Sequence, residues 1–242
     1  MPMSILEPVT SCAHRQADRC NDCSARLTSV CSVLTPAELL EFEEMSRSRP
    51  FRSGDILVSE NEPTDYLFTV TEGMVRLYRT LTDGRRQIFG FAMPGDFLGL
   101  SLLNMGDFTA EAVTAGAACK FPRADFIAFV DANPRFLRRL HEMASGELRM
   151  AQDQMVLLGR KSAEQRVAAF IVLLRRRLRR TGDTSKILPL PMSRQDIADY
   201  LGLTIETVSR TITKLCRDKL IAVVPHGLDL LKLERLEALA AD

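Results

Sequence analysis

The chain has 242 residues, of which 46% are hydrophobic and 26% are charged, a composition typical of soluble globular domains. This length suits two domains that each bury their own core. No apolar run approaches the ~18 residues that a membrane-spanning helix needs, and residues 1–19 lack the apolar stretch of a secretory signal. We therefore expect a cytoplasmic protein that makes no membrane contact.

The net charge of +1 conceals an asymmetry along the chain. Residues 1–161 carry 18 Lys and Arg against 21 Asp and Glu, whereas residues 162–242 carry 14 against 10. A basic C-terminal domain is what a protein that binds a polyanion would show. A few surface lysines could give the same balance, so this indication needs support from a motif.

Cysteines are concentrated at the start of the chain, where residues 1–34 show no clear period. Cys12, Cys20, Cys23 and Cys31 fall there, whereas Cys119 and Cys216 lie far away. In a cytosolic chain, such a group favours metal ligation over a disulfide framework. Cys20 and Cys23 form a C-x2-C pair and Cys31 follows after seven residues, but zinc and iron–sulfur clusters both use such pairs.

A predicted short helix at residues 36–48 precedes a region of short apolar segments. Turn signals such as Asp83-Gly84 separate these segments, which are residues 55–58, 66–70, 74–78, 87–92, 110–113 and 118–121. Many short strands at a spacing of about ten residues are typical of an antiparallel sandwich or barrel. The sequence therefore predicts a β domain over residues 35–133.

Residues 134–161 show a helical stripe instead of a strand pattern. Apolar residues recur every three or four positions, at Leu137, Leu140, Ala144, Leu148, Ala151, Met155 and Leu158. A helix of this length spans about 42 Å at 1.5 Å per residue, and its narrow stripe resembles a coiled-coil seam. Pairing with a second copy of the chain is one interpretation; packing along the chain's own β domain is the alternative.

Two short helices joined by a glycine turn are predicted after residue 192. Ser193 can cap the first helix, with Asp196 completing a capping box. Gly202 ends this helix, and Thr204 can cap the second one. Such a pair is typical of a helix-turn-helix.

The second helix is predicted to have two unlike faces. Apolar residues point inward (Ile205, Val208, Ile212 and Leu215), and polar residues share the opposite side (Glu206, Ser209, Arg210 and Thr213). Arginine can form paired hydrogen bonds to guanine, and glutamate can accept one from cytosine. Taken alone, this pattern also fits an ordinary amphipathic surface helix.

The elements around these two helices predict a winged helix. A helix is expected within residues 162–181 and a strand at 187–190, and a hairpin is expected from residues 221–224 and 228–233. We assign residues 162–242 to a winged helix-turn-helix domain that binds double-stranded DNA.

The order of sensor sandwich, long helix and winged helix resembles the CRP/FNR superfamily of transcription regulators over nearly the whole chain. Residues 201–210 read LGLTIETVSR and resemble the FNR branch, whose recognition helix carries Glu-x-x-Ser-Arg; residues 161–171, KSAEQRVAAFI, resemble its hinge region. The resemblance implies an α+β fold with a double-stranded β-helix (jelly-roll) sensor domain at residues 35–133. It also implies a dimerisation helix at residues 134–161.

The resemblance implies several partners. They are a second copy of the chain, an inverted-repeat DNA site of the TTGAT type, and RNA polymerase, which the turn at residues 82–86 would contact. No cyclic nucleotide is expected, because the Gly-Glu-Leu turn and Arg-Ser pair of a phosphate site are replaced by Gly99-Leu100-Ser101 and Phe108-Thr109-Ala110.

The C-x2-C-x7-C spacing resembles the FnrN-type oxygen sensors of α-proteobacteria. By this resemblance Cys20, Cys23 and Cys31 are three ligands of an oxygen-labile [4Fe–4S] cluster, within a cluster-binding segment at residues 1–34. The fourth ligand would be Cys119, which precedes a Phe-Pro step as in the family; Cys12 is the local alternative. Cys216 is predicted to be a small core residue.

The implied function is an oxygen-responsive regulator, mainly an activator, whose cluster controls dimerisation. Some family members carry an acidic residue on the dimer helix where this chain has Ala151, which predicts weaker oxygen control. Two alternatives stay open: a structural metal without sensing, and a different redox or nitric oxide signal. An electron-transfer iron–sulfur protein is a rival from another class, but it would have no use for a recognition helix. An enzyme is not expected, because His14, His141 and His226 are scattered.

Overall fold

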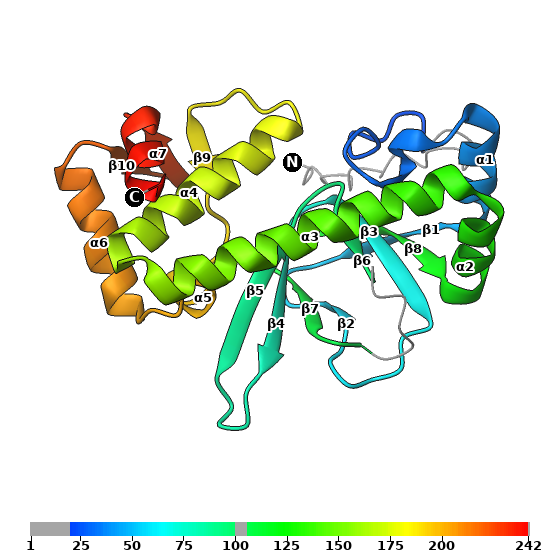
Figure 1. Cartoon of the computed structure of the whole chain (residues 1–242), viewed down its shortest axis with the longest axis horizontal. Coiled ribbons are helices and arrows are strands. Elements are labelled where there is room, and N and C mark those ends of the chain that lie inside the picture. The colour runs from blue at the N-terminus through cyan, green and yellow to red at the C-terminus, as the bar shows by residue number, and fades with distance from the viewer. Residues whose placement is uncertain (1–19, 100–105, 242) are drawn as a thin grey trace, which may run out of the picture.

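The computed structural model describes residues 20–99 and 106–241, so Cys12 lies outside the described residues. In chain order these residues form a β domain, one long helix and a helical domain with a small sheet (Figure 1). Within the described part, no helix is both long and apolar enough to cross a membrane.

Two four-stranded antiparallel sheets form the β domain. One has the order β1-β8-β3-β6 and the other the order β2-β7-β4-β5. The strands are β1 (Arg47–Phe51), β2 (Ile56–Val58), β3 (Tyr66–Glu72), β4 (Val75–Thr80), β5 (Arg86–Ala92), β6 (Phe97–Leu98), β7 (Thr109–Ala112) and β8 (Gly116–Pro122). Buried side chains such as Phe68, Val70 and Ala118 fill the core of this sandwich, which confirms the predicted β architecture.

A layer of helices covers the outer face of the β1-β8-β3-β6 sheet. It contains η1 (Val30–Val33), α1 (Pro36–Met45), α2 (Arg123–Ala132) and the start of α3 (Pro134–Arg160). Phenylalanines hold it together: Phe42 of α1 lies 4.6 Å from Phe121 and 5.2 Å from Phe136, between ring centroids. The N-terminal half of α3 is therefore fixed to the β domain by a shared core.

The predicted helix at residues 36–48 is shorter than expected. A capping box between Thr35 and Glu38 begins α1, with the Thr35 N–H donating to Glu38 Oε2 at 2.7 Å. The helix ends at Met45 because residues 47–51 pair with β8 as an edge strand, a position that tolerates Pro50. Helix α2, which the sequence analysis did not predict, follows β8 directly.

The long helix α3 crosses the molecule from the cysteine segment to the C-terminal domain (Figure 1). A turn at Lys161 separates it from α4 (Ala163–Arg180), which Ser162 caps. Arg166 stabilises this turn by donating hydrogen bonds to Leu158 O at 2.7 Å and Lys161 O at 2.9 Å.

The C-terminal domain is the predicted winged helix. It contains β9 (Ile187–Pro189), α5 (Arg194–Leu201), α6 (Ile205–Arg217), β10 (Ile221–Val224), β11 (Gly227–Leu230) and α7 (Leu233–Ala241). The last helix was not predicted; Leu236 anchors it in the core of this domain, beside α4.

Candidate functional site

The predicted helix-turn-helix consists of α5 and α6, whose caps are those predicted. Ser193 accepts a hydrogen bond from the Asp196 N–H at 3.0 Å, and the Asp196 carboxylate accepts one from the Ser193 N–H at 2.9 Å. Gly202 takes the left-handed conformation at the end of α5, with φ of 60°. Thr204 caps α6 by accepting from the Thr207 N–H at 3.2 Å.

One face of α6 is exposed and carries the four side chains predicted to read DNA: Glu206, Ser209, Arg210 and Thr213. Hydrogen bonds from its own backbone N–H and from Thr204 lower the pKa of Glu206, so this group is a carboxylate acceptor at neutral pH. The opposite face is buried through Val208, Ile212 and Leu215. The prediction that Ile205 points inward is wrong, because 38% of this first helical residue is exposed.

The four predicted cluster ligands line one small cavity at the other end of the molecule. Cys20, Cys23 and Cys31 come from the segment before α1, and Cys119 comes from the middle of β8. Cys216 lies in the other domain and packs partly against its core, as expected. The structure thus brings together one cysteine from the β domain and three that lie at least 88 residues earlier in the sequence.

The chemistry of this cavity fits a thiolate-bound metal group. Burial raises the pKa of the Cys31 thiol to about 12, and the neighbouring Cys20 and Cys23 add to the rise. A metal that binds there must displace the proton. The cavity has a volume of about 20 Å³, and within residues 20–99 and 106–241 no three His, Cys, Asp or Glu side chains are arranged to hold a metal ion. The four cysteine side chains must therefore be rearranged before they can hold a metal group.

The cysteine segment also contacts α3. Helix η1 packs against α3, and the Arg139 guanidinium donates a hydrogen bond to Thr28 O at 3.3 Å. Phe136 and Leu140 of α3 are buried in the core cluster that Cys20, Cys31 and Cys119 border. The position of the segment and that of the helix are therefore coupled.

Only part of the predicted dimerisation stripe of α3 is exposed to solvent. Leu137, Ala144, Leu148, Ala151 and Met155 are exposed, with 61% of Leu148 and 69% of Met155 accessible. Leu158 is half-buried. Leu140 departs from the prediction because it is 6% exposed and serves the chain's own core. The helix therefore packs on its own β domain at its start and presents an open apolar face further along.

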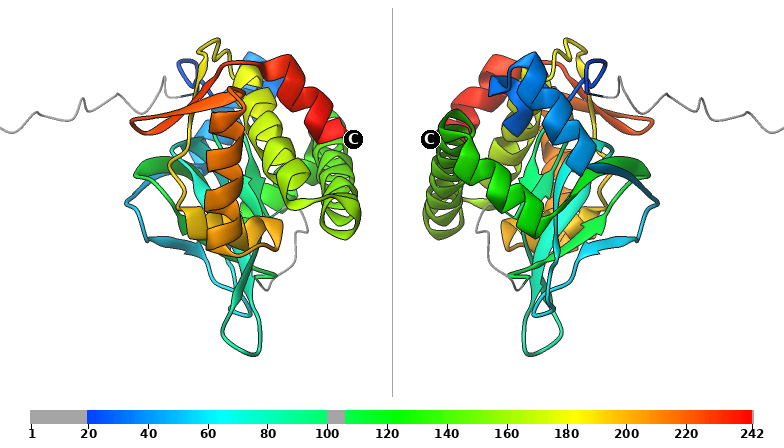
Figure 2. Two further views of the ribbon diagram at one scale, coloured as in Figure 1. Left: turned by 90° about the vertical axis from the view of Figure 1, so that its left-hand side faces the viewer. Right: turned by 90° about the vertical axis from the view of Figure 1, so that its right-hand side faces the viewer.

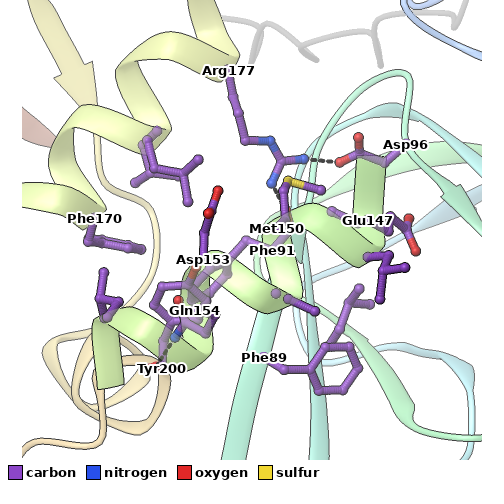
Figure 3. A pocket seen from close by; sticks show the side chains of 18 of the residues that line it. Phe89, Phe91, Asp96, Glu147, Met150, Asp153, Gln154, Phe170, Arg177 and Tyr200 are labelled. Carbon is purple, nitrogen blue, oxygen red and sulfur yellow. Dashed lines mark hydrogen bonds and ion pairs between the residues drawn. The ribbon is translucent and has the colours of Figure 1, made fainter. Parts of the chain in front are cut away.

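This open face borders a cavity of about 750 Å³ between α3, β5, α4 and α5 (Figure 3). The cavity is mainly apolar, with Phe89, Phe91 and Phe170 in its wall. Desolvation there raises the pKa of Glu147 to about 7; the Asp96 charge adds to the rise and Arg177 opposes it. The stripe residues Ala144, Leu148, Ala151, Met155 and Leu158 line the same hollow.

Polar contacts join the C-terminal domain to the β domain. Arg177 of α4 donates to Phe91 O at 2.7 Å and pairs with Asp96 (Figure 3). Arg76 of β4 lies 3.2 Å from the Asp196 carboxylate, and the Gln87 amide donates to Asp199 O at 2.7 Å.

Asp196 has two roles at this junction. One carboxylate oxygen caps α5 and the other faces Arg76 and Arg86 of the β4–β5 hairpin. The orientation of α5, and with it α6, is therefore tied to the β domain. The tip of the hairpin at residues 82–85 is exposed and projects from the molecule (Figures 1 and 2).

Comparison with known proteins supports this arrangement. Residues 48–133 match the model of the cyclic nucleotide-binding domain, and residues 165–239 match that of the Crp-like helix-turn-helix domain. The chain is 53% identical to the nitrogen fixation regulation protein FixK of Bradyrhizobium diazoefficiens, over 92% of this chain and 94% of that protein. It is 48% identical to the transcriptional activatory protein AadR of Rhodopseudomonas palustris, over 97% of each chain. The solved structure of FixK2 from Bradyrhizobium japonicum has a TM-score of 0.76 at 37% identity, over 81% of this chain and 98% of that one.

Proposed function

The chain belongs to the Crp/FNR family of transcription regulators, and we propose that this member is an oxygen-responsive activator of genes for anaerobic or microaerobic life. It is a DNA-binding regulator rather than an enzyme. The names of its relatives, a nitrogen fixation regulator and a transcriptional activatory protein, support activation.

The observation that carries the oxygen response is the convergence of four cysteines on one cavity. Cys20, Cys23, Cys31 and Cys119 are the ligands we assign to a [4Fe–4S] cluster. When bound, the cluster would tie the four cysteines together through metal–thiolate bonds, and these bonds would be lost when oxygen oxidises the cluster. The protein's part is to hold the cysteine segment against β8 and α1 while those bonds last.

The signal leaves the cysteine segment through α3. Arg139 and the apolar contacts of Phe136 join the start of this helix to the segment and its core. Its later stripe, from Ala144 to Leu158, is where we place the partner's helix in a homodimer. A change of a few kcal/mol in pairing is enough to act as a switch, because DNA binding requires both half-sites to be read together.

We assign sequence reading to the exposed face of α6. Its four polar side chains, Glu206, Ser209, Arg210 and Thr213, would meet one half of an inverted repeat of the TTGAT type. The exposed tip of the β4–β5 hairpin, at residues 82–85, is the surface we assign to RNA polymerase.

A cyclic nucleotide is not the signal in this proposal, although the sensor domain matches a model of that name. The strand that would supply a phosphate-binding Arg-Ser pair reads Phe108-Thr109-Ala110, which offers no cation. Arg76 and Arg86, on the neighbouring hairpin, face carboxylates.

The direct test is the absorption spectrum and the iron and sulfide content of protein purified without oxygen, before and after exposure to air. We expect an iron–sulfur absorption band that disappears in air together with binding to the inverted repeat. Zinc in place of iron would identify a structural metal. An iron–sulfur cluster that survives air and responds to nitric oxide would identify a different signal.

A further inference from the structure

Thr69 places a polar group in the apolar layer behind the cysteines. This residue lies in the middle of β3 and is 2% exposed. Its Oγ1 atom is buried and makes no hydrogen bond. A buried hydroxyl without a partner destabilises a folded chain, so its presence in the centre of the sheet requires an explanation.

The strand register directs this hydroxyl toward the cysteine cavity. Thr69 pairs with Cys119 of the antiparallel neighbour β8, so both side chains lie on the same face of the sheet. Phe68 and Val70, on either side, face the interior of the sandwich. Thr69 and Cys119 both line the cavity that Cys20, Cys23 and Cys31 border.

The neighbouring Thr71 shows that this environment does allow a threonine to find a backbone partner. Thr71 lines the same cavity, but its hydroxyl donates to Ala117 O at 2.9 Å. The register shift between Val70 and Glu72 accompanies this contact. Thr69 lies before the irregularity, where the β3–β8 ladder is regular.

We propose that the Thr69 hydroxyl donates a hydrogen bond to a sulfur of the metal-loaded cysteine cavity and so slows the loss of the metal group in air. Sulfur that is bound to iron carries negative charge and accepts hydrogen bonds, and such bonds raise the reduction potential of an iron–sulfur cluster. A higher potential makes oxidation by oxygen less favourable. The inference rests on the proposed function, because the acceptor exists only when the cavity is loaded.

The test compares Thr69→Val with the wild-type chain, after reconstitution of both to equal iron content. The variant keeps the shape of the side chain and all four cysteines, and lacks the hydroxyl. We expect its iron–sulfur absorption to decay roughly three- to tenfold faster in air, the rate equivalent of one hydrogen bond. Thr69→Ser keeps the hydroxyl and should show the wild-type rate. Thr71→Val removes a hydroxyl that donates to Ala117 O, and it should leave the rate unchanged.

A second measurement needs no metal. In the metal-free chain, Thr69→Val removes an unpaired buried hydroxyl, so Tm should rise by roughly 2–4 °C. Thr71→Val should lower Tm, because it removes a hydroxyl that has a partner. An unchanged or lower Tm in Thr69→Val would show that the hydroxyl is satisfied without metal, and would overturn the inference.

The outcomes separate this inference from the proposed function. Equal decay rates in wild type and Thr69→Val overturn the role of Thr69 and leave the oxygen-labile cluster in place. A wild-type chain that takes up no iron overturns both. Faster decay in Thr69→Val and Thr71→Val alike would indicate loosening of the sheet, and would also overturn the specific role of Thr69.

Discussion

The two halves of α3 are held in opposite ways. The first half buries Phe136 and Leu140 among the phenylalanines of the sensor domain. The second half exposes Leu148 and Met155 beside a large apolar cavity. It contacts the C-terminal domain near its end, where the Gln154 amide donates to Tyr200 O at 2.9 Å and the half-buried Leu157 packs against the core of that domain.

This difference shows how one helix can receive a signal and transmit it. Apolar burial fixes the first half next to the cysteines, so a change in the segment at residues 20–31 reaches α3 directly. Most of the second half is exposed before Leu157, and it keeps an apolar face that a second chain can cover. Long-range control requires both properties: one half of α3 that is fixed next to the cysteines, and another half whose exposed face can bind or release a second chain.

The largest effects should come from the ligands themselves. Alanine substitution of Cys20, Cys23, Cys31 or Cys119 should abolish the cluster completely, because four thiolates are needed to hold it. Iron and sulfide analysis of protein purified without oxygen measures this. Cys216→Ala, in the other domain, is the matched control and should keep full iron content. Full content in Cys119→Ala, with loss in Cys12→Ala, would move the fourth ligand to Cys12.

The contrast between the two halves of α3 can be measured as stability. Phe136→Ala removes a fully buried ring and should lower the free energy of unfolding by about 3–5 kcal/mol. Met155→Ala should change the free energy of unfolding of the single chain little. It should weaken the pairing of two chains through α3. Denaturant unfolding and sedimentation, run on both variants, measure the two quantities. Equal losses of chain stability would contradict the difference between the halves.

At the reading end, Arg210→Ala should lose discrimination at one base pair of each half-site, at a cost of ~1–3 kcal/mol per half-site. Gel shifts with operator variants measure this loss. If the variant weakened binding to all DNA sequences equally, Arg210 would be a phosphate contact instead of a base-reading residue.

The smallest effect should come from the charge of Glu147 at the edge of the open face. In the single chain its pKa is about 7, and a partner helix that covers Glu147 would desolvate the carboxyl group further and raise this pKa, so pairing takes up a proton and weakens as the pH rises through about 7. Pairing should therefore be stronger at pH 6 than at pH 8, by roughly two- to fivefold in the dissociation constant for this partly exposed group. Sedimentation at both pH values, without oxygen, measures this.

Two variants act as controls for Glu147. Glu147→Gln should remove the pH dependence, and Glu147→Leu should promote pairing even in air. Arg138→Leu, on the exposed side of α3 away from the stripe, should do neither. A pH dependence that persists in Glu147→Gln would assign the titration to another group.

Elements with a strong local signal were predicted well from the sequence. The capping box at Ser193 and the left-handed Gly202 fix α5 through contacts within a few residues, and the structure confirms both. The strand at residues 47–51 was missed because its polar sequence contains Pro50 and forms a strand only through pairing with β8. Local propensity cannot reveal a partner that lies about seventy residues away.

The same distinction between local signals and tertiary contacts applies to the candidate site. The exposed face of α6 follows from helical periodicity, whereas the burial of Leu140 depends on elements such as η1 and α2 that pack against α3. The junction at Asp196 and the unpaired hydroxyl of Thr69 have no sequence signal, because each depends on tertiary neighbours.

The central claim is that loss of the metal group at the cysteine end acts on DNA through pairing of α3. The most direct measurement is sedimentation of the wild-type chain during stepwise exposure to air, with iron–sulfur absorption and binding to the inverted repeat recorded on the same samples. We predict that the dimer fraction and DNA binding fall together with the absorption. A dimer fraction that stays constant while DNA binding falls would contradict the claim, and would mean that the signal reorients an existing dimer.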